Sequence, residues 1–223
     1  MAAVANAWMP GAGRIHCTAS GGLYRGGAPR AVWLTTEADP ATHSARAIAE
    51  RYEDKEPTAH LVWNPVTGET VQLLPATVPA IGRLGCDPDP AREGRICLVI
   101  EVVGHAEKPF TDRPLTGIDP ILSWLDSWEV ARTWPAGPPP PADQPPPQHT
   151  AATRLWALGG HFGHSQVPGS RAIGPGAISP DRLLGSYLPG APGKTEDHHA
   201  PATAHAFLPS GTTTGSRPAM AHT

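Results

Sequence analysis

The segment "GRICLVIEVVG", residues 94–104, limits the possible folds of this chain more than any other stretch. Its apolar residues run almost continuously and many are β-branched, which is typical of a strand covered on both faces of a sheet. A strand of that kind lies in the centre of a sheet and requires other elements packed on each side. The sequence therefore predicts an α/β protein with a mixed central β-sheet flanked by helices.

Short apolar runs predict the remaining strands of that sheet. They are residues 30–36, 59–63 and 69–75. The last two flank "NPVTG", whose Asn, Pro and Gly are turn formers, so we expect a hairpin there. All three are expected to join residues 94–104 in one sheet.

Three helices are predicted around the sheet. The segment 38–54 places apolar residues on one helical face, with Asp39 as the N-cap and Pro40 at the first helical position. A second helix over 118–128 carries an apolar stripe. A shorter helix is expected over 179–188, because a serine precedes the Pro-Asp pair that begins it.

Proline and small residues set the expected domain limits. The 223 residues include 28 prolines and 24 glycines. The proline-rich stretch 135–148 is expected to be an extended loop. From residue 189 onward, large apolar side chains are too few to offset the entropy of ordering the chain. We predict one domain over 1–188, which contains the proline-rich loop, and a disordered tail over 189–223.

Charge and hydropathy exclude several classes of partner. The formal net charge is −3, so the chain lacks the basic field that neutralises nucleic-acid phosphates. No apolar run approaches the ~20 residues of a membrane-spanning helix, and the first residues form no secretory signal. Cys17, Cys86 and Cys97 have no CxxC spacing, which argues against a disulfide framework and a zinc ribbon. We expect a monomer without a nucleic-acid or membrane partner.

Two segments carry residues suited to chemistry. Glu101 interrupts the central strand near its C-terminal end, where a carboxylate must be paired, protonated or turned toward a polar cavity. An ion pair with an arginine would explain it as a structural residue. His161 and His164 lie in "GGHFGHSQVPG", which is interpreted as a loop because its glycines are unsuited to a helix or a core. Each is either part of a metal site or a loop histidine bonded to backbone.

Four segments together resemble a known family. They are "AVWLTTE", "AHLVWNPVTGETVQLLPAT", "RICLVIEVVGHAEKPFT" and "GGHFGHSQVPGSRAIGPGAI". In this order and at these separations they are similar to the zinc-dependent N-acetylmuramoyl-L-alanine amidases of the amidase type 2 and peptidoglycan-recognition superfamily, especially forms from actinobacteria and their phages. The resemblance spans about Trp8 to Leu184, and it implies a mixed sheet with surrounding helices and a groove that holds peptidoglycan.

The resemblance also implies a reaction. Such enzymes cut the amide between the lactyl group of N-acetylmuramic acid and the first L-alanine of the stem peptide. A zinc ion with three protein ligands activates the attacking water, and a carboxylate transfers the proton. Glu101 matches that catalytic carboxylate, and His164 matches a metal-ligand histidine in "GHSQVPG". The implied cofactor is zinc, and the implied partner is peptidoglycan or a muropeptide.

The other two ligand positions depart from the family pattern. Leu34 stands where the family has a histidine, in a pattern like "VWHTTE", and Gly174 stands where it has an aspartate or cysteine, in a pattern like "DPGAI". Ala172 occupies a further position that is cationic or histidine in the family. Leucine and glycine have no side-chain lone pair. We therefore expect zinc binding to be weak or absent and hydrolysis to be impaired.

Substitute ligands are conceivable at His161, at His60, or at the adjacent His16 and Cys17, although none is at a family ligand position. The chain is thus predicted to be a peptidoglycan amidohydrolase by descent. A non-catalytic peptidoglycan-binding module and a variant copy without a selected function are the alternatives. Without a secretory signal, the location is either cytoplasmic or reached by a non-standard route of release to the cell wall.

Overall fold

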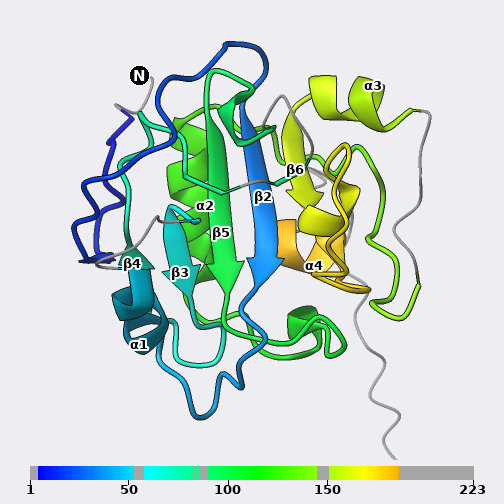
Figure 1. The fold of residues 1–223 in the computed structure, drawn as a ribbon. Helices are drawn as coiled ribbons and strands as arrows, with labels where there is room; N and C mark the ends of the chain where they lie inside the picture. Colours follow the sequence, from blue (N-terminus) through cyan, green and yellow to red (C-terminus); the bar gives the residue numbers. More distant parts are fainter. Residues whose placement is uncertain (1–4, 53–57, 83, 86–89, 145–150, 186–223) are drawn as a thin grey trace, which may run out of the picture. The chain divides into compact units, whose positions relative to one another are not determined.

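The computed structural model describes residues 5–52, 58–82, 84–85, 90–144 and 151–185 (Figure 1). Within these ranges, six strands form one sheet in the order β1-β4-β3-β5-β2-β6. The strands are β1 (Gly13–Arg14), β2 (Arg30–Thr35), β3 (Leu61–Trp63), β4 (Thr70–Gln72), β5 (Cys97–Val102) and β6 (Gly160–Gly163). Helices pack on both faces. The predicted α/β fold with a mixed central sheet is confirmed.

Strand β5 occupies the centre of the sheet, as its apolar run predicts. It pairs in parallel with β2 on one side and with β3 on the other, and all of its residues are buried. Strands β3 and β4 form the predicted antiparallel hairpin. In the turn between them, the Asn64 side-chain oxygen accepts hydrogen bonds from the backbone N–H groups of Val66 and Thr67. The pairing is therefore mixed, and the hairpin closes through an asparagine side chain.

The first helix begins later than the sequence predicts. Helix α1 spans Ala45–Ala49 and continues as the short 3-10 helix η1, Glu50–Tyr52. Its N-cap is Ser44, whose Oγ accepts a hydrogen bond from Ala47 N (3.0 Å). The prediction of Asp39 as the N-cap is wrong, because the Asp39 carboxylate instead accepts from Ala41 N within a separate turn (3.0 Å).

Helix α2 (Ile118–Ser127) covers one face of the sheet and lies behind β5 in Figure 1. It buries its predicted apolar stripe in a core that also contains the side chains of Trp33 and Trp63. Helix α4 (Pro180–Leu184), capped by Ser179 as predicted, packs into the same core. The other face is covered by α1 and by Trp156 of helix α3 (Ala152–Ala157). Thus the sheet separates two hydrophobic cores.

The interpretation of the glycine-rich segment as a loop is wrong. Gly160–Gly163 forms the buried edge strand β6, which pairs in parallel with β2. The glycines serve close packing. Gly160 has φ 89°, and a Cβ on it would lie 2.7 Å from the carbonyl oxygen of Thr133. Composition alone cannot distinguish such a strand from a flexible loop, because the contact that requires glycine comes from a distant residue.

Parts of the predicted domain plan lie outside the described residues. Residues 135–144 form turns without helix or strand. Outside the described ranges lie the rest of the predicted proline-rich loop, the end of the helix predicted to reach residue 188, Cys86, and the predicted tail at 189–223. The domain boundary at residue 188 stays a prediction. None of the helices in the described ranges has the length and apolar character to cross a membrane.

Candidate functional site

The carboxyl ends of three strands bring the sequence-predicted positions together. Leu34 and Glu101 are partners in the parallel register of β2 and β5. Trp33 pairs with Gly163, the last residue of β6, so His164 follows next to Leu34. Paired residues in a sheet point to the same face, and alternate residues share a face. The register therefore gathers Leu34, Glu101 and His164 on one face, with β5 and β6 two strand spacings, about 10 Å, apart.

Side-chain contacts agree with this register. Leu34 and Tyr52 both pack against the hydrophobic core on the α1 side of the sheet, which includes Leu84. The hydroxyl of Tyr52 donates to Glu101 Oε2 (2.9 Å) and Oε1 (3.2 Å). His164 Nε2 donates to the carbonyl oxygen of Leu84 (3.0 Å). Glu101 and His164 therefore lie on the same face of the sheet.

Position 174 lies next to the end of β2. The carbonyl oxygen of Gly174 accepts a hydrogen bond from Ser165 N (3.0 Å), and a Cβ on Gly174 would lie 2.6 Å from Thr35 Oγ1 and 3.1 Å from Ala106 Cβ. Thr35 Oγ1 donates to Glu37 Oε1 (2.6 Å), which also accepts from Ala106 N (3.0 Å). This hydrogen-bonded group occupies the space that a longer side chain at 174 would need.

Glu101 is a buried carboxylate whose partner is Tyr52. Its side chain is 8% exposed, and burial raises its pKa, which the Tyr52 hydrogen bonds and the charge of Arg51 only partly offset. Burial also raises the pKa of Tyr52 to about 12, so its hydroxyl stays a donor at neutral pH. Within the described ranges Glu101 forms no ion pair with an arginine. A carboxyl group with a raised pKa is suited to taking and returning a proton.

His164 retains the lone pair that a metal ligand needs. A carbonyl oxygen can only accept, so the bond to Leu84 fixes the proton on Nε2 and leaves the lone pair on Nδ1. Nδ1 makes no hydrogen bond to another described residue. Burial lowers the pKa of His164, which keeps the ring neutral near pH 7. One ligand position of the family pattern is thus chemically intact.

His161 cannot replace a missing ligand, because it points into the other core. It pairs with Ala31 in the β2–β6 register, and its Nδ1 accepts a hydrogen bond from Trp33 Nε1 (3.1 Å). Its ring is stacked between those of Trp33 and Trp134, with centroid distances of 6.0 and 6.2 Å, and is fully buried. His161 is neither a loop histidine bonded to backbone nor a donor to this site.

The other suggested substitutes do not complete a metal site either. Both ring nitrogens of His60 are occupied, since Nδ1 accepts from Val99 N (3.0 Å) and Nε2 donates to the Val78 carbonyl (2.9 Å). His16 is exposed and Cys17 is half-buried in the N-terminal segment. The part of the chain that the structure describes contains no group of three His, Cys, Asp or Glu residues able to hold a metal. Because a catalytic zinc needs three protein ligands, the described donors do not fit one.

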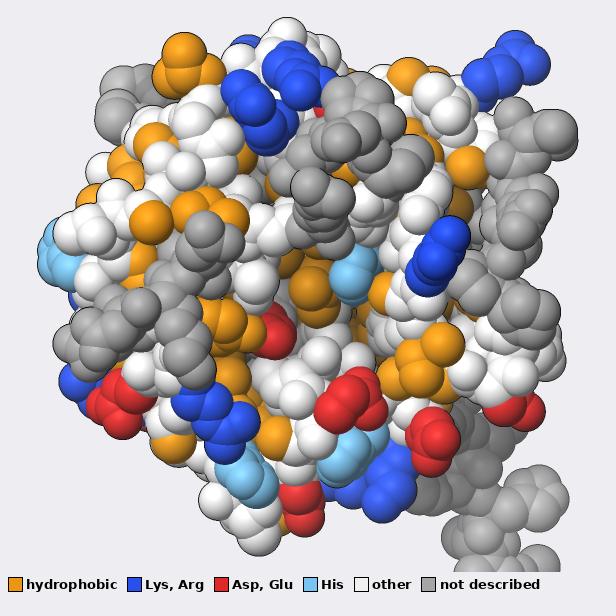
Figure 2. Space-filling view, in the orientation of Figure 1, with side chains coloured by type: hydrophobic (Ala, Val, Ile, Leu, Met, Phe, Trp, Pro, Cys, Tyr) orange, Lys and Arg blue, Asp and Glu red, His pale blue; other side chains and the backbone are white. Residues whose placement is uncertain are grey.

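The face of the molecule that carries these residues is hollowed. Figure 2 shows it in front of the sheet, with the hollow near the carboxyl end of β2. Histidine, acidic and hydrophobic side chains are visible together around it. Leu34, Glu101 and His164 on this face of the sheet, with Gly174 beside the end of β2, define the candidate functional site.

Comparison with known proteins now identifies the fold. No protein-family model and no curated protein matches the sequence. Among solved structures, the chain is similar to the Staphylococcus aureus hydrolase AmiA in complex with its ligand, with a TM-score of 0.51 and 12% identity over 79% of this chain and 81% of that chain. The chain has the amidase and peptidoglycan-recognition fold. At this identity the likeness extends to the fold and not to an activity.

Two further structures are similar at lower scores. One is the endolysin N-acetylmuramoyl-L-alanine amidase LysCS from Clostridium intestinale, with a TM-score of 0.47 and 11% identity over 81% of this chain and 97% of that chain. The other is the Drosophila peptidoglycan recognition protein SD, with a TM-score of 0.40 and 14% identity over 75% of this chain and 90% of that chain.

Within this amidase fold, sequence reasoning missed three residues of the site. Tyr52 was assigned only to the apolar face of a helix, although its hydroxyl is the partner of Glu101. Thr35 and Glu37 were not considered, although they fill the space next to Gly174. The available signal for Thr35 and Glu37 was their position in "LTTE", at the carboxyl end of a parallel strand, where sites form. Tyr52 carried no comparable signal.

Proposed function

We propose that this chain is a peptidoglycan amidohydrolase by descent, whose groove binds muropeptides and whose zinc-dependent hydrolysis is impaired. The observation that carries the proposal is the strand register, which places Leu34 beside Glu101 and next to His164. The proton-transfer carboxyl and one histidine are retained at the positions of the family pattern. The two positions without a lone pair, Leu34 and Gly174, account for the impairment.

Hydrolysis of the amide between the lactyl group and L-alanine has three requirements. A water must be activated, the carbonyl must be polarised, and the leaving amine must receive a proton. Glu101, hydrogen-bonded to Tyr52 and little exposed, is suited to the proton transfer. In the family, a zinc ion would activate the water and polarise the carbonyl, but the described residues do not provide the three ligands that such an ion needs. The chain is therefore expected to bind its substrate and to cleave it slowly or not at all.

The test combines binding with cleavage. The full chain, purified without added metal, is expected to bind soluble muropeptides saturably and to release no stem peptide from purified peptidoglycan, with or without added zinc. Leu34→Trp, which enlarges the side chain beside Glu101, should weaken binding, whereas Leu158→Trp at the exposed C-cap of α3 should not. Chelator-sensitive release would refute the impairment, and absence of muropeptide binding would refute the proposed substrate.

A further inference from the structure

A second pocket lies beyond the carboxyl end of β5. It has a volume of about 80 Å³, and its lining includes Asp39, Pro40, His105, Lys108, Phe110 and Arg113. Neither Glu101 nor His164 lines it, so it is distinct from the site that those two residues define. Three basic side chains and one acidic side chain contribute to its wall.

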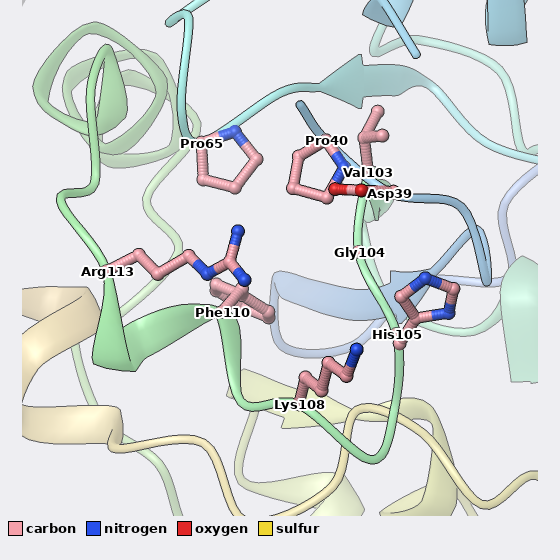
Figure 3. Close-up of a pocket in the computed structure, with 9 residues that line it drawn as sticks. All are labelled: Asp39, Pro40, Pro65, Val103, Gly104, His105, Lys108, Phe110 and Arg113. Atoms are coloured by element: carbon pink, nitrogen blue, oxygen red, sulfur yellow. The ribbon is translucent and has the colours of Figure 1, made fainter. Parts of the chain in front are cut away.

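The basic groups converge on one space. Figure 3 shows the Arg113 and Lys108 side chains extending toward the pocket from different parts of the β5–α2 connection, with the His105 ring on a third side. The ring of Pro40 lies on the side away from Lys108, and that of Phe110 lies near Arg113. A ligand in this space would therefore meet cationic groups against apolar walls.

The segment that carries these groups is held in place by its own contacts. The backbone N–H of Lys108 donates to the carbonyl of His105 (3.1 Å), which closes a tight turn. Phe110 is 3% exposed and packs edge-on against Trp63, with ring centroids 6.1 Å apart. Thr111 Oγ1 accepts a hydrogen bond from Ser179 N (2.9 Å). The backbone of the pocket is thus fixed before any ligand binds, which limits the entropic cost of binding.

The positive charge of the pocket exceeds its negative charge within the described ranges. Lys108 and Arg113 form no ion pair with another described residue. His105 Nδ1 lies 3.7 Å from a carboxylate oxygen of Glu37. The Asp39 carboxylate already accepts a hydrogen bond from Ala41 N (3.0 Å). The pocket therefore holds two cations without an ion-pair partner among the described residues, Lys108 and Arg113, and one carboxylate, Asp39, which accepts a hydrogen bond within its own turn.

We propose that this pocket binds one small oxyanion group, a carboxylate or a phosphate, between Lys108 and Arg113. The planar guanidinium of Arg113 can donate two parallel hydrogen bonds to two oxygens of such a group, and the Lys108 ammonium adds a point charge. The apolar walls strengthen both interactions by excluding water from one side. The site does not depend on the proposed amidase ancestry.

The test titrates the full chain with inorganic phosphate and, separately, with sodium acetate, at constant ionic strength held by chloride. Backbone amide shifts in two-dimensional NMR spectra should saturate and should be concentrated at residues 103–113. Lys108→Ala and Arg113→Ala should each raise the dissociation constant about tenfold, which is the effect expected from the loss of one charge-assisted hydrogen bond. Tighter binding of phosphate or of acetate shows which oxyanion the pocket prefers, and saturable binding of either supports the site.

Two further variants separate binding from damage to the fold. Asp39→Asn keeps the oxygen that accepts from Ala41 N and removes the like charge, so it should tighten anion binding severalfold. Arg154→Ala removes an exposed arginine on α3, away from the pocket, and should change nothing. Shifts that never saturate, equal weakening by Arg154→Ala, or no gain from Asp39→Asn would each overturn the proposal.

Discussion

The carboxyl group of Glu101 destabilises the fold that holds it. It is buried in the central strand, and its hydrogen-bond partner is a neutral hydroxyl, so burial raises its pKa above the unfolded value of about 4.3. A group whose folded pKa is raised contributes stability only below its unfolded pKa, and that contribution is lost as pH rises through the folded pKa. Packing and stability therefore do not account for a glutamate at this position.

We expect Glu101→Gln to stabilise the protein at pH 7 by about 1 kcal/mol, because glutamine keeps an acceptor for the Tyr52 hydroxyl without a charge to bury. The gain should disappear below about pH 4, where glutamate is protonated in both states. Thermal unfolding at pH 7 and pH 4 measures both effects. Tyr52→Phe, which removes the hydroxyl, should destabilise at pH 7. A loss of stability on Glu101→Gln at pH 7 would contradict this account.

His161 makes stability sensitive to acid. Burial lowers its pKa to about 3, below the unfolded value of about 6.5, and its Nε2 finds no hydrogen-bond partner in the described part of the chain. The unfolded state therefore binds more protons between about pH 6.5 and pH 3, so stability is lost as pH falls through that window. Buried His60, with a pKa lowered to about 4, acts in the same direction.

We predict that His161→Phe flattens this acid dependence in part. At pH 7.5 the variant should be less stable by about 1–2 kcal/mol, because Trp33 Nε1 loses its acceptor. Its deficit should shrink by pH 4.5, where the parent protein is penalised for keeping His161 neutral. Urea unfolding at the two pH values gives the comparison. A deficit that is the same at both would show that His161 does not couple protonation to folding.

Among the helices and strands, the sequence predicted those that are determined by their local residue pattern. Strand β5 and helix α2 follow from apolar pattern, and the β3–β4 hairpin follows from turn chemistry. Strand β6 was missed because Gly160 is required by its contact with the distant Thr133, which no local pattern reveals. The start of α1 was misplaced because Asp39 was taken as the N-cap, whereas its carboxylate closes a separate turn and Ser44 caps the helix.

Strand β6 provides a direct test of that contact. We expect Gly160→Ala to lower the free energy of unfolding by about 3 kcal/mol, because the methyl group adds overlap with the Thr133 carbonyl to the strain of a positive φ. Gly137→Ala has a similar positive φ but open space around the methyl, so it should cost only about 1 kcal/mol. Equal losses in chemical denaturation would show that backbone strain alone requires glycine in β6.

For the whole molecule, the sheet converts distant sequence positions into neighbours. The family resemblance allowed Leu34, Glu101, His164 and Gly174 to be named in advance, and the register shows how β2, β5 and β6 bring three of them to one face. The resemblance could not show which side chains lie beside position 174. The contact of Thr35 Oγ1 with the space beside Gly174 is visible only in the folded chain.

That contact changes how zinc binding could be restored. Leu34→His with Gly174→Asp would add two donor side chains, but the new Cβ at 174 would lie 2.6 Å from Thr35 Oγ1. The double variant should therefore lose about 1–3 kcal/mol of stability and bind zinc poorly. Adding Thr35→Ala removes the obstructing oxygen. The triple variant should recover stability and bind one zinc, with strongly non-additive effects, because each single change leaves at most two ligands.

Zinc content after dialysis and competition with a chelator measures this restoration independently of catalysis. The pair Leu34→His and Thr35→Ala, without a carboxylate at 174, is the matched control and should bind zinc weakly. Zinc binding by the double variant as tight as that of the triple variant would show that Thr35 is no obstacle. Release of stem peptides by the zinc-loaded triple variant, abolished by Glu101→Gln while zinc stays bound, would assign proton transfer to Glu101. Release that survives Glu101→Gln would place that role on another residue.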